Sequence, residues 1–166
     1  HHHFAPPAWV SEVRGRPLLQ PANTTWTPEE TIDDIVTKPD VSVRAWALNL
    51  RGIHLARQKR YDEAIASYDH AIKLDGRLSN AYLNKGNIAA SRGDHVTAIA
   101  LYKKAHAVEP NYYLPLNNWG ALLADLGEYA EALIRLQQAI HLDPKQVLPY
   151  GPIGALWDKM QDLERA

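Results

Sequence analysis

The chain has 166 residues, of which 46% are hydrophobic, and a net charge of −1 at pH 7. It contains no cysteine, which excludes disulfides and thiolate metal sites, and no apolar run of about 18 residues, so no membrane span is predicted. Lys and Arg exceed Asp and Glu by only two in residues 45–78 and in residues 79–112, too few for a nucleic-acid-binding face.

The first 44 residues form a segment of their own. Residues 1–3 are histidines and resemble the remnant of a purification tag. Residues 4–44 contain prolines at short intervals, which predicts an irregular N-terminal arm. A hydroxyl at Thr27, followed by Pro28 and two glutamates, is typical of a helix start. One short helix is therefore expected near residues 28–37.

The bulky apolar residues of this arm are Trp9 and Trp26. We expect them to hold the arm against the open end of the array that follows, because repeat arrays need a terminal cap. The alternative is that the arm lies in a binding groove as an internal ligand.

The rest of the chain repeats every 34 residues. The recurring residues are Gly52, Gly86, Gly120 and Gly154, then Ala64, Ala98, Ala132 and Ala166, then Ala71, Ala105 and Ala139, and then Tyr68, Tyr102 and Leu136. A strict period of this length predicts a solenoid of repeated supersecondary units. The units are residues 45–78, 79–112, 113–146 and a partial copy, residues 147–166, which is either an incomplete repeat or a capping helix.

Each unit contains two helical patterns. Conserved spacings of three and four residues place the recurring residues on one face of each helix. Gly93 and Gly127 are positioned for left-handed C-caps of the first helices, and Pro110 and Pro144 follow the second helices. Each unit is therefore predicted to be an antiparallel helix pair, in which the small residues allow close approach and Tyr68, Tyr102 and Leu136 fill the gap.

These residues resemble the tetratricopeptide repeat. The second copy supplies Tyr82, Gly86, Ala89, Ala98, Tyr102, Ala105 and Pro110, and the third supplies Leu116, Trp119, Gly120, Leu123, Ala132, Leu136, Ala139 and Pro144. The first copy supplies Leu48, Gly52, Leu55, Ala64, Tyr68 and Ala71, but has Gly76 in place of the proline. The resemblance covers residues 45–166 and implies an all-α, right-handed superhelical solenoid whose first helices line a concave groove.

The resemblance also implies which residues face that groove. The candidate peptide-binding residues are Trp46, Asn49, Arg57, Asn80, Asn84, Asn87, Asn117 and Asn118. An amide offers a donor and an acceptor together, which suits the backbone of an extended peptide. The alternative is that asparagine is simply the repeat's own preference at these positions.

Some members of the family grip a C-terminal carboxylate with lysines, an arginine and asparagines. The matching positions here are Asn49, Ile53, Asn84, Leu114 and Asn118. The asparagines are present and the cations are absent, so a receptor for the C-terminal tails of heat-shock chaperones is not expected.

Catalysis, a metal site and a cofactor are not predicted. The histidines at 54, 70, 95, 106 and 141 fall in different phases of the repeat, and no nucleophile elbow or phosphate-binding glycine loop is present. The expected function is a scaffold that binds a peptide or partner protein. The alternatives are a recruiting region of a larger enzyme, such as a glycosyltransferase, and a self-associating module. The compartment stays open, because cytoplasm and periplasm are both compatible with the sequence.

Overall fold

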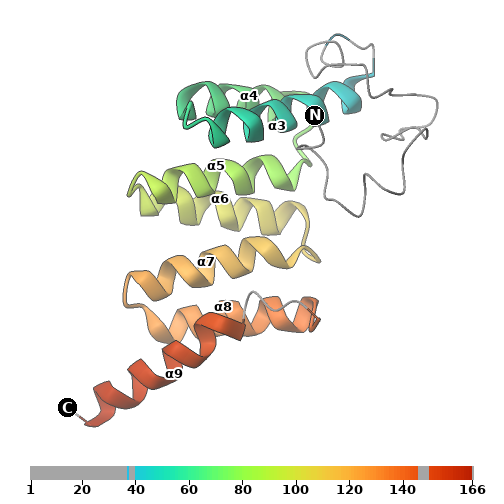
Figure 1. Cartoon of the computed structure of the whole chain (residues 1–166). Coiled ribbons are helices and arrows are strands. Elements are labelled where there is room, and N and C mark those ends of the chain that lie inside the picture. Colours follow the sequence, from blue (N-terminus) through green and yellow to red (C-terminus); the bar gives the residue numbers. More distant parts are fainter. Residues whose placement is uncertain (1–36, 38–39, 146–149, 166) are drawn as a thin grey trace. The chain divides into compact units, whose positions relative to one another are not determined.

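The computed structural model describes residue 37 and residues 40–145 and 150–165, and this part of the chain is helical with no strand (Figure 1). The helices are α3 (Val41–Arg57), α4 (Tyr61–Leu74), α5 (Ser79–Ser91), α6 (His95–Val108), α7 (Tyr113–Asp125), α8 (Tyr129–Leu142) and α9 (Tyr150–Arg165). The predicted short helix near residues 28–37 lies outside the described residues except for Thr37, which is in a turn. Trp9 and Trp26 also lie outside them.

The chain divides into two compact units, one ending at Ala81 and one beginning at Tyr82. In the first unit, α3 packs along α4 (Figure 1). In the second, α7 packs against both α6 and α8, and α9 contacts α8 and α7. Helices joined by short turns thus pack as antiparallel pairs, as the sequence pattern predicts.

α3 begins at Val41, within the stretch that the sequence pattern assigns to the arm. The carboxylate of Asp40 caps it, because Oδ1 accepts hydrogen bonds from the backbone N–H groups of Ser42 at 2.8 Å and Val43 at 3.2 Å. These bonds satisfy two of the donors that the first turn of a helix leaves unpaired.

The turns inside the helix pairs share one hydrogen-bonding pattern. Gly93 and Gly127 have φ values of +79° and +83°, which confirms the predicted left-handed caps. The N–H of the residue after each glycine bonds back five residues, from Asp94 to Ala89 and from Glu128 to Leu123. This is the Schellman arrangement, in which the glycine satisfies the geometry without a Cβ penalty.

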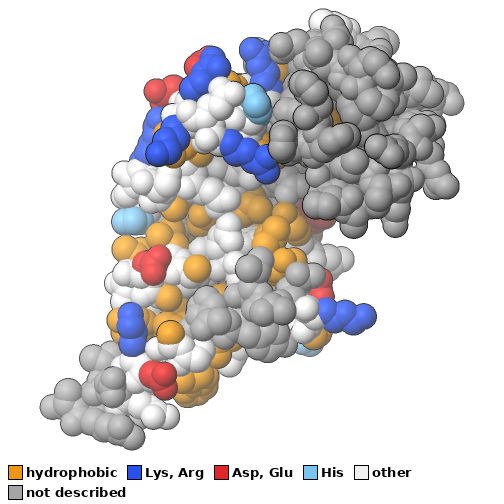
Figure 2. Space-filling view, viewed as in Figure 1, with side chains coloured by type: hydrophobic (Ala, Val, Ile, Leu, Met, Phe, Trp, Pro, Cys, Tyr) orange, Lys and Arg blue, Asp and Glu red, His pale blue; other side chains and the backbone are white. Residues whose placement is uncertain are grey.

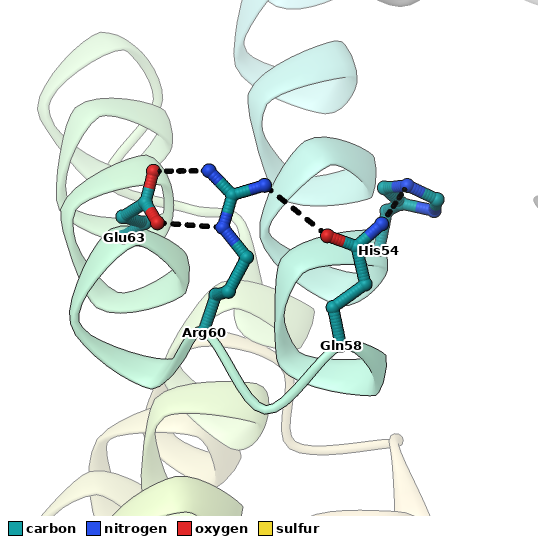
Figure 3. A network of polar contacts seen from close by, with 4 residues as sticks. All are labelled: His54, Gln58, Arg60 and Glu63. Carbon is teal, nitrogen blue, oxygen red and sulfur yellow. Dashed lines mark hydrogen bonds and ion pairs between the residues drawn. The ribbon is translucent and has the colours of Figure 1, made fainter.

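The turn between α3 and α4 has the same geometry with a different residue. Lys59 takes the left-handed position with φ +61°. Beside it, the guanidinium of Arg60 donates two hydrogen bonds of 2.6 Å to the carboxylate of Glu63 and one of 3.2 Å to Oε1 of Gln58. The amide nitrogen of Gln58 lies 2.7 Å from Nε2 of His54 (Figure 3). Both charged side chains are exposed, so these contacts order the turn more than they stabilise the fold.

The recurring glycines lie where two helices approach most closely. A Cβ atom built on Gly86 would lie 2.6 Å from Cε1 of Tyr102, and one built on Gly120 would lie 2.8 Å from Cγ of Leu136. A Cβ on Gly52 would likewise overlap the ring of Tyr68. The prediction that small residues admit a large side chain from the second helix is therefore confirmed in all three complete repeats.

The core of the second unit is built from these repeat positions. The buried residues include the recurring alanines of α6 and α8, which are Ala98, Ala105, Ala132 and Ala139, and the large side chains that face the glycines. Trp119 is 8% exposed, and the guanidinium carbon of Arg135 lies 4.2 Å from the centre of its ring. The charged group of Arg135 is itself paired with Glu131, so a cation and an aromatic ring close the surface of this core.

Candidate functional site

The eight candidate groove residues all lie on the first helices of the pairs. Trp46, Asn49 and Arg57 are on α3; Asn80, Asn84 and Asn87 are on α5; Asn117 and Asn118 are on α7. The first four belong to one compact unit and the last four to the other.

In the first unit, the candidates differ in how much surface they offer. Arg57 and Asn80 are exposed and Trp46 is half-buried. Asn49 is only 5% exposed, although its amide was expected to face a ligand. Asn117 has the same phase in the repeat and is only 9% exposed. The side chains in this phase therefore point mainly into the packed helices.

In the second unit, three candidate asparagines are brought together on α5 and α7. The amide nitrogen of Asn118 donates to Oδ1 of Asn87 at 2.8 Å. The hydroxyl of Tyr102, on α6, donates to the same oxygen at 3.0 Å. The amide nitrogen of Asn117 donates to Oδ1 of Asn118 at 3.1 Å. We call Asn87, Tyr102, Asn117 and Asn118 the amide cluster. Asn84 lies one turn earlier on α5 and is half-buried.

The amide cluster determines which atoms of Asn87 can bind a ligand. A carbonyl oxygen has two lone pairs, and Oδ1 of Asn87 already accepts two hydrogen bonds. Asn87 is exposed, so its NH2 group is what it offers outward. Burial raises the pKa of Tyr102 to about 12, and its hydroxyl therefore keeps its proton at neutral pH and can donate. The cluster presents N–H donors more than acceptors.

Asn117 supports the amide cluster from its buried side. Its side chain is nearly buried, and its nitrogen holds the oxygen of Asn118. Among the described residues, its own Oδ1 is buried and has no hydrogen-bond partner. A buried amide that is half satisfied is costly, and the hydrogen bond from its nitrogen orients Asn118 toward Asn87.

The role of Tyr102 was not predicted from the sequence, which assigned its ring to the gap beside Gly86. A comparison of equivalent positions in the three copies could have indicated this role. Positions equivalent to Asn87 hold Ile53 in the first copy and Ala121 in the third, and Leu136 replaces the tyrosine in the third. A hydroxyl and an amide therefore face each other only in the second copy.

The visible face of α5 and α7, the helices that carry the asparagines of the amide cluster, has few charged side chains. Figure 2 shows hydrophobic and uncharged side chains over α5 and α7, with few charged ones among them. In the described ranges, no three His, Asp or Glu side chains are grouped so as to hold a metal ion. No helix among the described residues is both long and apolar enough to cross a bilayer. Recognition at this surface would rest on neutral hydrogen bonds and apolar contact.

A shallow cavity of about 420 Å³ lies elsewhere, mainly on α8. Leu116 and Ile134 contribute apolar lining, and His106 and His141 contribute imidazoles. The cavity shares no residue with the amide cluster.

Comparison with known proteins shows which family the first repeats resemble. Residues 43–109 match the model of the tetratricopeptide repeat. This match covers less than half of the chain and shows that residues 43–109 are similar to tetratricopeptide repeats. No curated protein matches it at a significant level.

Solved tetratricopeptide domains have the same fold. The domain of Arabidopsis OM64 is 19% identical and superposes with a TM-score of 0.67 over 72% of this chain and 99% of its own. The Sgt2 domain from Aspergillus fumigatus is 18% identical, with a TM-score of 0.68 over 74% of this chain and 82% of its own. The first such domain of Spaghetti (RPAP3), bound to the HSP90 peptide SRMEEVD, is 20% identical, with a TM-score of 0.67 over 72% of this chain and 95% of its own. The predicted all-α, tetratricopeptide-like solenoid is therefore confirmed.

Proposed function

We propose that this protein is a protein-interaction scaffold that binds an extended peptide, or an extended segment of a partner protein, along α5 and α7. The observation that carries the proposal is the amide cluster. Oδ1 of Asn87 accepts two hydrogen bonds, which fix the orientation of the side chain. Its exposed NH2 group can therefore donate to an acceptor on a ligand. The acceptors that an extended peptide offers at every residue are its backbone carbonyl groups.

The proposed role is binding and not catalysis. The side chains gathered on α5 and α7 are carboxamides, which neither transfer protons nor act as nucleophiles at neutral pH. A recruiting region of a larger enzyme would use the same peptide-binding surface, so this alternative concerns the setting of the module and not its chemistry.

The preferred peptide should be neutral or apolar along this surface. The peptide bound to the Spaghetti domain contains two glutamates and an aspartate. In this chain, the positions that match the carboxylate-binding residues of other family members carry no charge. Asparagines supply the donors, and Ile53 and Leu114 stand where cations would be expected. Without a cation, these positions offer an acidic peptide no ion pair to offset the desolvation of its carboxylates.

A peptide library displayed on phage would test the proposal. The chain is used to select binders, and the affinity of a selected peptide is measured by calorimetry with Asn87→Ala, Asn118→Ala and the double variant. Each hydrogen bond contributes about 0.5–1.5 kcal/mol, so the double variant should bind about ten times more weakly. The peptide SRMEEVD serves as the acidic comparison and should bind more weakly than the selected peptide.

Asn111 provides the matched control, because it is an exposed asparagine in the turn between α6 and α7. Asn111→Ala should leave the affinity unchanged, and circular dichroism should show equal helix content in all variants. Unchanged affinity in the double variant, or an equal loss in Asn111→Ala, would refute the proposal.

A further inference from the structure

The connection between α4 and α5 departs from the repeat at one residue. Pro110 and Pro144 follow the second helices of the second and third repeats, and Gly76 stands at the same place in the first. It follows Asp75, and no other Asp-Gly or Asn-Gly pair occurs in the sequence. Glycine differs from proline in two ways that matter for chemistry at this position, because it has a backbone N–H group and lacks a bulky side chain.

The backbone around Gly76 has the conformation that suits a proline. Asp75 is extended, with φ −138° and ψ 98°, which is the region that a residue before proline adopts. In the part of the chain that the structure describes, the N–H of Gly76 donates no hydrogen bond to another backbone group. Gly76 is exposed, and an added Cβ would meet only the carbonyl oxygen of Ile72, at 3.8 Å. The amide nitrogen of Gly76 is therefore available for reaction.

The carboxyl group of Asp75 is folded over the peptide bond that contains this nitrogen. Its Oδ1 accepts a hydrogen bond from the backbone N–H of Arg77 at 3.0 Å, and Nε of Arg77 lies 3.7 Å from the same oxygen. A side-chain oxygen that bonds to the N–H two residues later closes an Asx turn. Such a turn brings the carboxyl carbon back toward the intervening peptide, so Cγ of Asp75 faces the nitrogen of Gly76.

The third repeat contains the same turn with a proline in it. Oδ1 of Asp143, two periods after Asp75, accepts a hydrogen bond from the N–H of Lys145 at 3.2 Å, and Pro144 lies between the two residues. Both aspartates directly follow the last residue of a second helix. The two turns therefore present equivalent carboxyl groups, but only the first has an N–H group at the intervening residue.

We propose that Asp75 and Gly76 form a site of spontaneous covalent modification, at which the folded chain converts Asp75 into an isoaspartyl residue. The nitrogen of Gly76 attacks Cγ of the protonated carboxyl group and loses its proton, the N–Cγ bond forms, and one carboxyl oxygen leaves as water. Water then adds to the main-chain carbonyl of the resulting five-membered imide and breaks the bond from this carbonyl to the nitrogen. The chain now runs through Cγ, and the former main-chain carbonyl carbon carries a free carboxylate.

The product changes the backbone between α4 and α5. It adds one carbon atom to the main chain and takes out of it the carbonyl group of Asp75, which accepts a hydrogen bond from the N–H of Leu78 at 3.2 Å. α5 begins at Ser79, so the modification alters the chain just before this helix. The new carboxylate is a substrate for an enzyme that methylates isoaspartyl groups. This site shares no residue with the amide cluster, so its outcome does not depend on the function proposed above.

Incubation of the full chain at 37 °C and pH 7.4 tests the proposal, with digestion after lysine and liquid chromatography coupled to mass spectrometry. Residues 74–85 form one peptide in this digest. Isomerisation leaves the mass of the peptide unchanged but alters its retention and its fragment ions, whereas deamidation of an asparagine changes the mass. The isomer should accumulate with time, and an isoaspartyl methyltransferase should transfer labelled methyl groups from S-adenosylmethionine to the same peptide.

Two variants locate the reaction. Gly76→Pro removes the attacking N–H and restores the residue of the other repeats, so the isomer should be undetectable. Gly76→Ala keeps the N–H and fits the open space, but its Cβ hinders the attack, so the isomer should form several-fold more slowly. Circular dichroism should show the helix content of the parent chain in both variants. The matched control is the peptide that contains Asp143 and Pro144, in which no isomer should form.

Three results would overturn the proposal. The first is an absence of the isomer in the folded chain, whether or not the chain unfolded in urea forms it. The second is an isomer that Gly76→Pro and Gly76→Ala form as fast as the parent chain. The third is isomerisation of the other aspartates at the same rate as Asp75, because this turn would then have no special reactivity.

Discussion

The ring of Tyr102 covers the backbone of Gly86 so closely that a Cβ at residue 86 would lie 2.6 Å from Cε1 of the ring. Tyr102 is 2% exposed, so it has no free space into which to retreat. The glycine and the aromatic ring, 16 residues apart, thus set the separation of α5 and α6. The 34-residue period repeats this contact.

Gly86→Ala should destabilise the chain by about 1–3 kcal/mol, because an overpacked core forces side chains or backbone to shift. Gly154→Ala is the control, since no described atom lies near that position. It should be neutral or slightly stabilising, as alanine favours helix over glycine. Urea unfolding of both variants measures the difference, and equal behaviour of the two would contradict the packing argument.

Lys59→Gly should raise the free energy of unfolding by up to about 1 kcal/mol. A left-handed conformation costs a residue with a side chain about 1–2 kcal/mol, and glycine avoids this cost. Part of the stability gained is lost because glycine has greater conformational freedom in the unfolded chain. Gly93→Ala makes the reverse change at the equivalent turn and should be destabilising. The midpoints of urea unfolding, compared at an unchanged dependence of the free energy on urea concentration, measure both effects. A loss of stability in Lys59→Gly would show that the lysine side chain contributes more than the strain of its backbone costs.

Tyr102→Phe should cost about 0.5–1 kcal/mol of stability, because it removes one of the two hydrogen bonds to Asn87 and leaves the ring in place. Tyr68→Phe is the comparison in the first repeat, where Ile53 occupies the position of Asn87 and offers no acceptor. A smaller loss is expected there. Equal losses in thermal unfolding would show that the amide cluster adds nothing to stability.

Hydrogen bonds from the side chain and then the backbone of Thr97 hold the pKa of Asp94 below its ordinary value. A lowered pKa in the folded state contributes stability that is present above the ordinary carboxyl pKa and is lost as the pH falls through the lowered value. Asp94→Asn should therefore be less stable than the parent chain at pH 7, and the two should converge in acid. Urea unfolding between pH 7 and pH 3 tests this, and a difference that stays constant with pH would exclude the carboxylate as its source.

The sequence pattern predicted the features that recur and missed those that occur once. The helix pairs, the glycine caps and the packing of Tyr102 on Gly86 follow from residue types at a fixed spacing. The hydrogen bond between Asn87 and Asn118 joins residues 31 apart whose positions in the repeat differ. It depends on side-chain rotamers across two helices, which periodicity does not encode. The low exposure of Asn49 and Asn117 has the same origin, because a helix phase gives a direction but not the depth of a side chain.

The three turns inside the helix pairs span only residues 58–60, 92–94 and 126–128. Closing so short a connection costs little chain entropy, and contacts between neighbours in the sequence are the kind that speed folding. A helix pair that opens can therefore close again before distant segments have to meet. The length of these turns favours rapid folding that can start at more than one place along the chain.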